Sequence, residues 1–236
     1  MEKDVIIACD FPSQEATLAF LERFGDERPF VKIGMELFYG AGPDIVKKLR
    51  DRGHRIFLDL KLHDIPNTVR KAMRVLAAQD IDMVNVHAAG TREMMAAALQ
   101  GLNEGTPEGR KRPYLIAVTQ LTSTSPQALA DQLYISRSME DTIAGYARNA
   151  KEAGLDGVVC SPLEAAAVKK ACGQEFLAVT PGIRYPDTGA DDQSRVTTPE
   201  RARQIGSDFI VIGRPITAAD DPVAAYHKAR REFTGK

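Results

Sequence analysis

The chain has 236 residues, 44% of them hydrophobic, with 31 Lys and Arg against 32 Asp and Glu. This length suits one large domain, residues 1–236, and is enough to bury roughly 70–75% of the surface that the unfolded chain exposes. The formal net charge of -1 is too balanced to indicate binding to nucleic acid or adhesion to a membrane, so an anionic ligand would have to be met by local cations.

The cysteine pattern and the apolar runs indicate the compartment. Cys9, Cys160 and Cys172 have no metal-like spacing and leave one thiol over in any disulfide scheme. Cys9 and Cys160 lie inside apolar runs, where a buried thiol is the simpler interpretation. The first residues lack the long apolar core of a signal peptide, and no apolar stretch reaches the ~20 residues needed to span a bilayer. We therefore expect a soluble, cytoplasmic protein.

Short apolar runs recur along the chain, and each is followed by a longer amphipathic segment. The runs are typical of buried strands, which we expect at Val5–Cys9, Phe30–Gly34, Arg55–Leu60, Met83–His87, Tyr114–Thr119, Gly157–Cys160, Phe176–Thr180 and Phe209–Gly213. Helical periodicity predicts helices at Ser13–Phe24, Pro43–Arg52, Thr68–Gln79, Arg92–Leu102, Met139–Ala153, Leu163–Ala171, Pro199–Ile205 and Pro222–Phe233. This alternation predicts a parallel sheet and, at this length, a closed (β/α)8 TIM barrel. An open doubly wound sheet is the alternative, but no GxGxxG motif opens a first helix.

Three connections stand out, one by its polarity and two by their length. Gly101–Pro113 is polar and is expected to be a surface loop before the fifth strand. Gln120–Tyr134 follows the fifth strand, and Pro181–Thr198 follows the seventh. Loops of this length in a compact domain are usually functional or disordered.

Polar residues gather where the expected strands end. In chain order they are Asp10, Lys32, Asp59, Lys61, His87, Thr122, Ser161, Arg184 and Arg214. Barrel enzymes build their active sites at the carboxyl ends of the strands. The pattern therefore predicts an enzyme.

The stretch DLKLHDIPNT, residues 59–68, concentrates charge where a strand passes into a helix. Side chains two apart on a strand share a face, so Asp59 and Lys61 are expected to project the same way. Pro66 suits the first turn of a helix, which places Asp64 in the strand-to-helix connection within reach of Lys61. Lys32 interrupts another apolar strand and needs a counter-ion, for which Asp59 on the next strand is the natural candidate.

These four residues predict an alternating array, Lys32–Asp59–Lys61–Asp64. A structural ion-pair network that closes the barrel mouth is the alternative interpretation. Buried ion pairs seldom stabilise a protein more than an apolar replacement would, so we favour a catalytic role.

Arg184 and the segment Gly213-Arg214 predict a phosphate site. Barrels often hold phosphate between the loops that follow strands seven and eight, and Arg214 can offer a bidentate fork. The alternative is that both arginines are solvated loop charges. No spacing of His, Cys and Asp resembles a zinc site, although Asp59 and Asp64 could in principle hold Mg²⁺.

With Asp59-x-Lys61-x-x-Asp64, Lys32, Asp10 and the segment Ile212-Gly213-Arg214-Pro215, the chain closely resembles the orotidine 5′-phosphate decarboxylase family. The resemblance runs the length of the chain, and DLKLHDIPNT and PGIR (181–184) are its most specific parts. It is greatest to the short bacterial form, which has no fused transferase domain. It implies decarboxylation of orotidine 5′-monophosphate to UMP, the last step of de novo pyrimidine synthesis, with no cofactor and no metal.

The resemblance also implies a role for each site residue. Lys61 would stabilise and protonate the C6 carbanion, and Asp59, Lys32 and Asp64 would complete the catalytic array. The residues implied to contact the substrate are Asp10, Lys32, Asp59, Thr68, Thr122, Arg184, Gln193, Gly213 and Arg214. The family forms homodimers, in which Asp64 and Thr68 would reach into the site of the partner chain.

Two other functions compete with this one. Sugar-phosphate enzymes of the same barrel superfamily also carry Asp-x-Lys-x-x-Asp on the third strand, but use its carboxylates with Mg²⁺ to hold an enediolate. Lys32 and the PGIR segment favour the decarboxylase. A catalytically silent barrel that senses a phosphorylated metabolite could lose Lys61 or Lys32, and this chain keeps both.

Overall fold

The computed structural model describes residues 3–185 and 196–236, and its centre is a closed parallel barrel in which each strand pairs with the next. The strands are β1 (Asp4–Ala8), β2 (Phe30–Gly34), β3 (Ile56–Leu62), β4 (Met83–His87), β5 (Tyr114–Val118), β6 (Gly157–Val159), β7 (Leu177–Thr180) and β8 (Phe209–Ile212). Pairing of β8 with β1, in which Asp4 lies opposite Phe209, closes the ring. The TIM barrel is thereby confirmed, and the open sheet is excluded.

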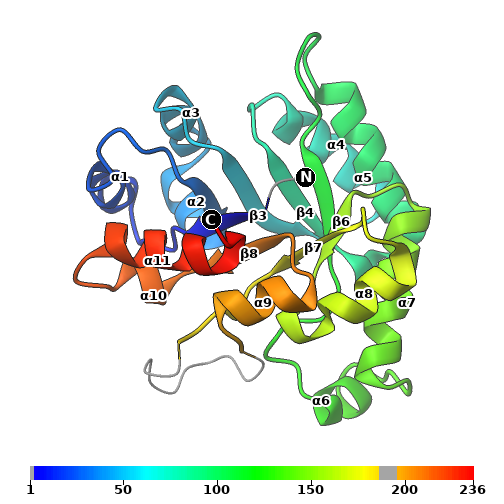
Figure 1. Ribbon diagram of the computed structural model, residues 1–236. Coiled ribbons are helices and arrows are strands. Elements are labelled where there is room, and N and C mark those ends of the chain that lie inside the picture. The colour runs from blue at the N-terminus through cyan, green and yellow to red at the C-terminus, as the bar shows by residue number, and fades with distance from the viewer. Residues whose placement is uncertain (1–2, 186–195) are drawn as a thin grey trace.

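Helices surround the barrel on its outer face (Figure 1). Eight of the described helices correspond to those predicted: α1 (Gln14–Glu22), α3 (Asp44–Asp51), α4 (Pro66–Ala77), α5 (Thr91–Gly105), α7 (Met139–Glu152), α8 (Ala165–Cys172), α9 (Pro199–Ile205) and α11 (Pro222–Thr234). Each overlaps one of the segments for which helical periodicity predicted a helix. No helix within the described ranges is both long and apolar enough to cross a membrane.

Three short helices are additional to those predicted. They are α2 (Met35–Ala41), α6 (Pro126–Asp131) and α10 (Arg214–Thr217), and two single turns of 3₁₀ helix precede α5 and α8. With six and four residues, α6 and α10 are too short to show a helical period. Helices of this length also depend on tertiary packing for their stability, which no local pattern reports.

Side chains along each strand alternate between the inside of the barrel and the helices outside it. Inside, apolar side chains such as Phe30, Phe57 and Met83 form one buried cluster. A second and larger cluster fills the space between the barrel and the helices. Cys9, Cys160 and Cys172 are buried and none of them forms a disulfide among the described residues, as the sequence indicated for the first two.

Helix α5 continues to Gly105, beyond the point where a surface loop was expected to begin. Gly101 and Gly105 lie against α4, and a Cβ atom on either would meet a backbone carbonyl oxygen of that helix at 2.1 Å. These glycines therefore allow two helices to approach closely, and Gly101 does not end the helix. The sequence interpretation of this segment as a loop from Gly101 was wrong for this reason.

The amino-terminal end of the barrel carries a repeated contact. An aspartate directly precedes each of β4, β6 and β8, accepts a hydrogen bond from a backbone N–H near the start of the preceding strand, and pairs with a cation. The three sets are Asp82 with Ile56 N (2.8 Å) and Arg50 (2.6 Å), Asp156 with Leu115 N (2.7 Å) and Arg112 (2.8 Å), and Asp208 with Ala178 N (2.8 Å) and Lys169 (2.6 Å). Because each carboxylate joins two strands and neutralises a cation, these contacts hold this end of the barrel together.

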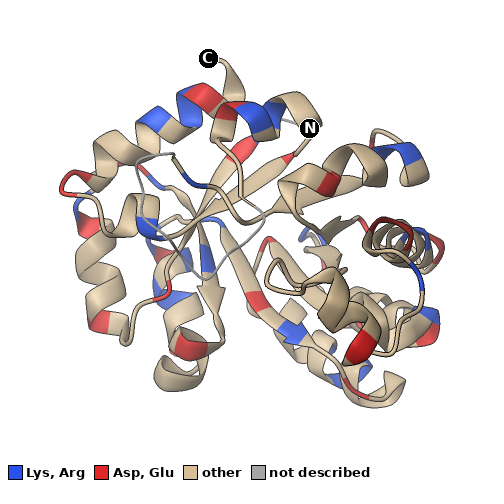
Figure 2. Ribbon diagram, turned by 90° about the horizontal axis from the view of Figure 1, so that it is seen from below, with Lys and Arg blue, Asp and Glu red and all other residues tan. Residues whose placement is uncertain are grey.

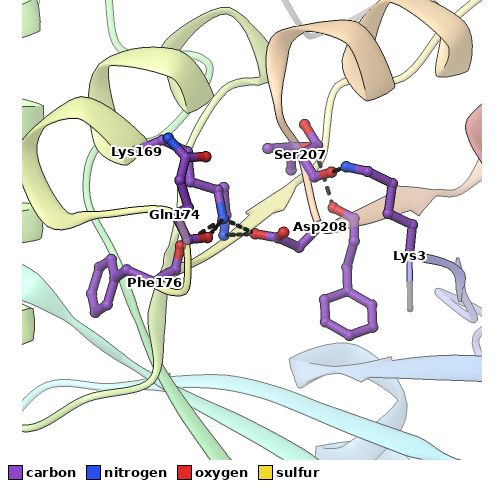
Figure 3. Close-up of polar contacts among 9 residues, drawn as sticks. Lys3, Lys169, Gln174, Phe176, Ser207 and Asp208 are labelled. Atoms are coloured by element: carbon purple, nitrogen blue, oxygen red, sulfur yellow. Dashed lines mark hydrogen bonds and ion pairs between the residues drawn. The ribbon is translucent and has the colours of Figure 1, made fainter. Parts of the chain in front are cut away.

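The Lys169 contact is the most buried of the three. Its ammonium group donates to the carbonyl oxygens of Gln174 (2.7 Å) and Phe176 (2.9 Å) as well as to Asp208 (Figure 3). Three acceptors match the three N–H donors of a lysine, so the buried charge is fully satisfied.

Replacing Lys169 with Met should destabilise the fold. The methionine keeps most of the apolar stem but leaves the Asp208 carboxylate without its cation, which costs about 3–5 kcal/mol when a buried pair is broken. Urea unfolding at pH 7 measures the loss. Lys170→Met, at an exposed position of the same helix, should change stability by less than about 0.5 kcal/mol. Equal effects of the two substitutions would contradict the structural role of Lys169.

Candidate active site

A cavity of about 480 Å³ opens at the carboxyl ends of the strands. The predicted site residues that line it are Asp10, Lys32, Asp59, Lys61, Thr122, Arg184, Gly213 and Arg214. They come from β2 and β3 and from the segments that follow β1, β5, β7 and β8, which are far apart in sequence. Seen from the direction of these loops, Lys and Arg are interspersed with Asp and Glu (Figure 2).

Four charged side chains of alternating sign form a chain of ion pairs in this cavity. The Nζ atom of Lys32 lies 2.8 Å from Oδ1 of Asp10 and 3.5 Å from Oδ2 of Asp59. The other oxygen of Asp59 lies 2.7 Å from Nζ of Lys61. Lys32 and Asp59 are each only 8% exposed, so their charges depend on one another more than on water.

The array keeps its buried members ionised. Burial opposes the charge on Lys32, but Asp59 and Asp10 outweigh it and raise the pKa of the ammonium group above its ordinary value. Burial likewise opposes the charge on Asp59, but Lys32 and Lys61 outweigh it and lower the pKa of the carboxyl group. The site therefore presents fixed charges over a wide range of pH.

Lys61 reaches Asp59 through an irregular backbone. The residue has φ 52°, in the left-handed region that costs a residue with a side chain about 1–3 kcal/mol. The β3–β4 pairing is regular to Leu58 and Val84 and resumes only at Leu62 and Val86. The regular alternation expected from the sequence is thus broken, although Asp59 and Lys61 do meet.

Asn85, at the centre of β4, is a functional candidate that the sequence reasoning missed. Its side chain is fully buried, donates to Oδ1 of Asp59 at 2.6 Å and accepts from the backbone N–H of Lys61 at 2.8 Å. A polar residue inside the apolar run MVNVH was the available signal. It is the same signal that identified Lys32.

Asp64 and Thr68 do not line the cavity of their own chain. Both are exposed, and the Asp64 carboxylate accepts from the backbone N–H of Ile65 at 2.6 Å. Asp64 lies in the connection between β3 and α4, beyond the bulge, and it makes no ion pair with Lys61 among the described residues. Within one chain the array therefore runs from Asp10 to Lys61, and not from Lys32 to Asp64 as expected.

The arginines predicted to bind phosphate lie at the side of the cavity formed after β7 and β8. Gly213 directly precedes α10, and Arg214 is the first residue of that helix. The segment after β7 is held by hydrogen bonds between Arg184 N and Thr197 O (3.0 Å) and between Thr197 N and Gly182 O (3.1 Å). Gln193 lies outside the described residues. Arg184 and Arg214, which are thirty residues apart in the sequence, thus line the same cavity.

Polar side chains that the sequence reasoning had not assigned also line the cavity, among them Gln120 and Ser123 in the loop after β5. Gln120 is 9% exposed, so most of it is shielded from solvent. Among the described residues, no group of three His, Cys, Asp or Glu side chains is arranged to hold a metal ion. Asp59, the carboxylate nearest the centre of the array, already lies between two ammonium groups, which disfavours a divalent cation there.

Fold and site together define a (β/α)8-barrel enzyme with a charged array at the carboxyl ends of its strands. Residues 3–229 match the family described as orotidine 5′-phosphate decarboxylase / HUMPS, and the chain belongs to this family.

Relatives with high identity carry the decarboxylase name. Orotidine 5′-phosphate decarboxylase of Geobacillus sp. (strain WCH70) is 55% identical over 236 residues, which are 100% of this chain and 99% of the relative. The enzyme of Bacillus caldolyticus is 57% identical over 235 residues, 100% of this chain and 96% of the relative. The crystal structure of the enzyme from Lactobacillus acidophilus superposes with a TM-score of 0.89 at 45% identity, covering 98% of this chain and 99% of that one. The chain is accordingly a carboxy-lyase of this family.

Replacing Asp59 with Asn should destabilise the folded protein in a pH-dependent way. The pKa of this carboxyl group is lowered on folding, so its contribution is present above the unfolded value of about 4 and is lost as the pH falls through the folded value. At pH 7 the variant should be less stable by about 3 kcal/mol. Below about pH 4 the difference should shrink.

Urea unfolding of both proteins between pH 7 and pH 3 measures this difference. Asp51→Asn serves as the control, because Asp51 forms an exposed pair with Lys47 that contributes little at any pH. A difference between Asp59→Asn and the unmodified protein that stays constant to pH 3 would show that Asp59 does not depend on the array for its charge.

Proposed function

We propose that this protein decarboxylates orotidine 5′-monophosphate to UMP without a cofactor, as the final step of de novo pyrimidine biosynthesis. The observation that carries the proposal is the ion-pair chain from Asp10 to Lys61, which lies in the same cavity as Arg184 and Arg214. One side of the cavity thus offers fixed charges for the reaction, and the other offers cations for a phosphate. The decarboxylase names of the relatives favour this substrate.

The cavity suits a nucleoside monophosphate. Its volume of about 480 Å³ lies within the range of about 300–1,000 Å³ that is usual for small-molecule sites. Arg184, Gln193, Gly213 and Arg214 hold the phosphate in this proposal. Asp10, Lys32 and Asp59 bind the ribose, and Thr122 contacts the base.

The reaction leaves an electron pair on C6, and no cofactor is proposed to delocalise it. When the bond between C6 and the carboxylate breaks, CO₂ leaves and the electron pair stays on C6. The Lys61 ammonium group stabilises this carbanion electrostatically and then transfers a proton to C6. Lys61 is left neutral and recovers its proton from water, so charge and atoms balance over the cycle.

The neighbours of Lys61 set its charge and position. The carboxylate of Asp59, 2.7 Å from the Lys61 Nζ atom, favours the protonated ammonium before reaction. Asp59 also lies beside the departing carboxylate in this proposal. Lys32, held between Asp10 and Asp59, completes the array.

We propose a cytoplasmic homodimer, in which Asp64 and Thr68 of each chain complete the site of the other. Support comes from the exposure of both residues and from their absence among the residues that line the cavity of their own chain. Asp64 would then add a second carboxylate near Lys61, as the family resemblance implies.

The defining experiment follows the ultraviolet absorbance of orotidine 5′-monophosphate after addition of purified protein in excess EDTA. Loss of absorbance with release of one CO₂ per UMP supports the proposal. Turnover that requires both Mg²⁺ and a sugar phosphate would instead identify the enediolate chemistry of the sugar-phosphate enzymes.

Lys61→Ala should reduce kcat by at least about 10⁴-fold, because it removes the charge that stabilises the carbanion and the proton that quenches it. Steady-state kinetics with circular dichroism as a check on folding measures this. Lys170→Ala, at an exposed position of α8, should leave kcat unchanged. More than about 1% residual kcat in folded Lys61→Ala would rule out Lys61 as the proton donor.

Arg214→Ala should lower kcat/KM by about 10²–10³-fold with little loss of stability, because Arg214 is exposed and its charge-assisted bonds would go to the phosphate. Arg231→Ala on α11, at the opposite end of the barrel, is the matched control. If Arg214→Ala retains the kcat/KM of the unmodified enzyme, as the Arg231→Ala control should, the assignment of Arg214 to the phosphate is wrong.

A further inference from the structure

Asn85 holds two parts of the site at once. Alternation along β4 points Met83 into the barrel core and places Asn85 in the next layer, nearer the cavity. The Nδ2 atom of Asn85 lies 2.6 Å from Oδ1 of Asp59, and its Oδ1 atom lies 2.8 Å from the backbone N of Lys61. Because a carboxylate only accepts and a backbone N–H only donates, these two partners fix the orientation of the amide.

The amide replaces a missing part of the β3–β4 ladder. Between the pairs Leu58–Val84 and Leu62–Val86, β3 advances by four residues while β4 advances by two. The backbone N–H of Lys61, left without a β4 carbonyl by this bulge, donates to the Asn85 side chain instead. The left-handed conformation of Lys61 is thereby stabilised by a buried neighbour whose own polar atoms are satisfied.

The same amide fixes the carboxylate of Asp59. One oxygen of Asp59 accepts from both Asn85 Nδ2 and Lys61 Nζ, so the three groups form a closed set of contacts. The donor is uncharged, so it restricts rotation of the carboxylate without adding to the positive charge of Lys32 and Lys61. A carboxylate in its place would repel Asp59, and an apolar side chain would leave both partners without a hydrogen bond.

We propose that Asn85 is a positioning residue for the decarboxylation, which sets the place of the Lys61 ammonium group through the Lys61 backbone and the Asp59 carboxylate. This inference rests on the proposed function, since it concerns the group that meets C6. A displacement of a reacting group by about 1 Å can reduce a rate by about 10²-fold. The role therefore predicts a loss in kcat and not in substrate binding.

The test compares Asn85→Ala and Asn85→Asp with the unmodified enzyme. Asn85→Ala should lower kcat by about 100-fold or more while KM for orotidine 5′-monophosphate and the Kd for UMP change less than about five-fold, because the phosphate contacts and the ribose contacts of Asp10 and Lys32 remain. Asn103→Ala, at an exposed position of α5, is the matched control and should leave kcat unchanged. Thermal unfolding shows which variants are folded at the assay temperature.

Asn85→Asp keeps the shape of the side chain and the acceptor for Lys61 N–H, so it covers the case in which Asn85→Ala does not fold. A protonated carboxyl group can donate to Asp59 as the amide does, whereas an ionised one cannot and repels it. The kcat of this variant relative to the unmodified enzyme should therefore rise at least several-fold as the pH falls from about 8 to about 6. A purely structural role predicts a ratio that does not change with pH.

The outcomes separate this inference from the proposed function. If the unmodified protein does not decarboxylate the substrate, the proposed function fails first. If it does, and folded Asn85→Ala retains its kcat or folded Asn85→Asp gives a pH-independent ratio, the positioning role of Asn85 is overturned.

Discussion

The ion pairs at the mouth of the barrel constrain the rest of the structure. Each buried charge there needs the oppositely charged side chain beside it, because an unpaired buried charge is unfavourable. Lys32 lies between Asp10 and Asp59, and Asp59 lies between Lys32 and Lys61, so β1, β2 and β3 must stand in one fixed register. Gly34, opposite Asp59 in the sheet, leaves room for this arrangement, since a Cβ atom there would lie 2.8 Å from the Asp10 carboxylate. Closing the barrel is what brings these strands together.

The two ends of the barrel use charge differently. At the amino-terminal end, Asp82, Asp156 and Asp208 each join neighbouring strands and a cation, and the Lys169 ammonium group has three acceptors. At the carboxyl end the charges face a cavity, and Lys61 adopts a left-handed backbone conformation. Stability at one end thus supports a strained and highly charged arrangement at the other, which is typical of sites that carry out chemistry.

Much of the fold followed from local patterns. Apolar runs located all eight strands, and β2 and β4 have the predicted bounds. Errors fell where tertiary packing replaces a local signal: Gly101 allows α5 to approach α4 and does not end it, and α6 and α10, with six and four residues, are too short to show a period. For the site, polar residues at strand ends indicated Asp59 and Lys61, and a charged residue inside an apolar run indicated Lys32. Asn85, a polar residue inside another apolar run, was missed.

The sequence by itself determined the barrel, the family and the residue types of the charged array, because period, spacing and a charged residue within an apolar run are local properties of a chain. Only the tertiary structure decided which charges pair. It joined Lys32 to Asp10 as well as to Asp59, and it placed Asp64 on the surface. It also revealed the β3 bulge and the bridge from Asn85 to Lys61. Such contacts depend on the register between strands and on side-chain directions over a few ångströms, which are fixed only when the barrel closes.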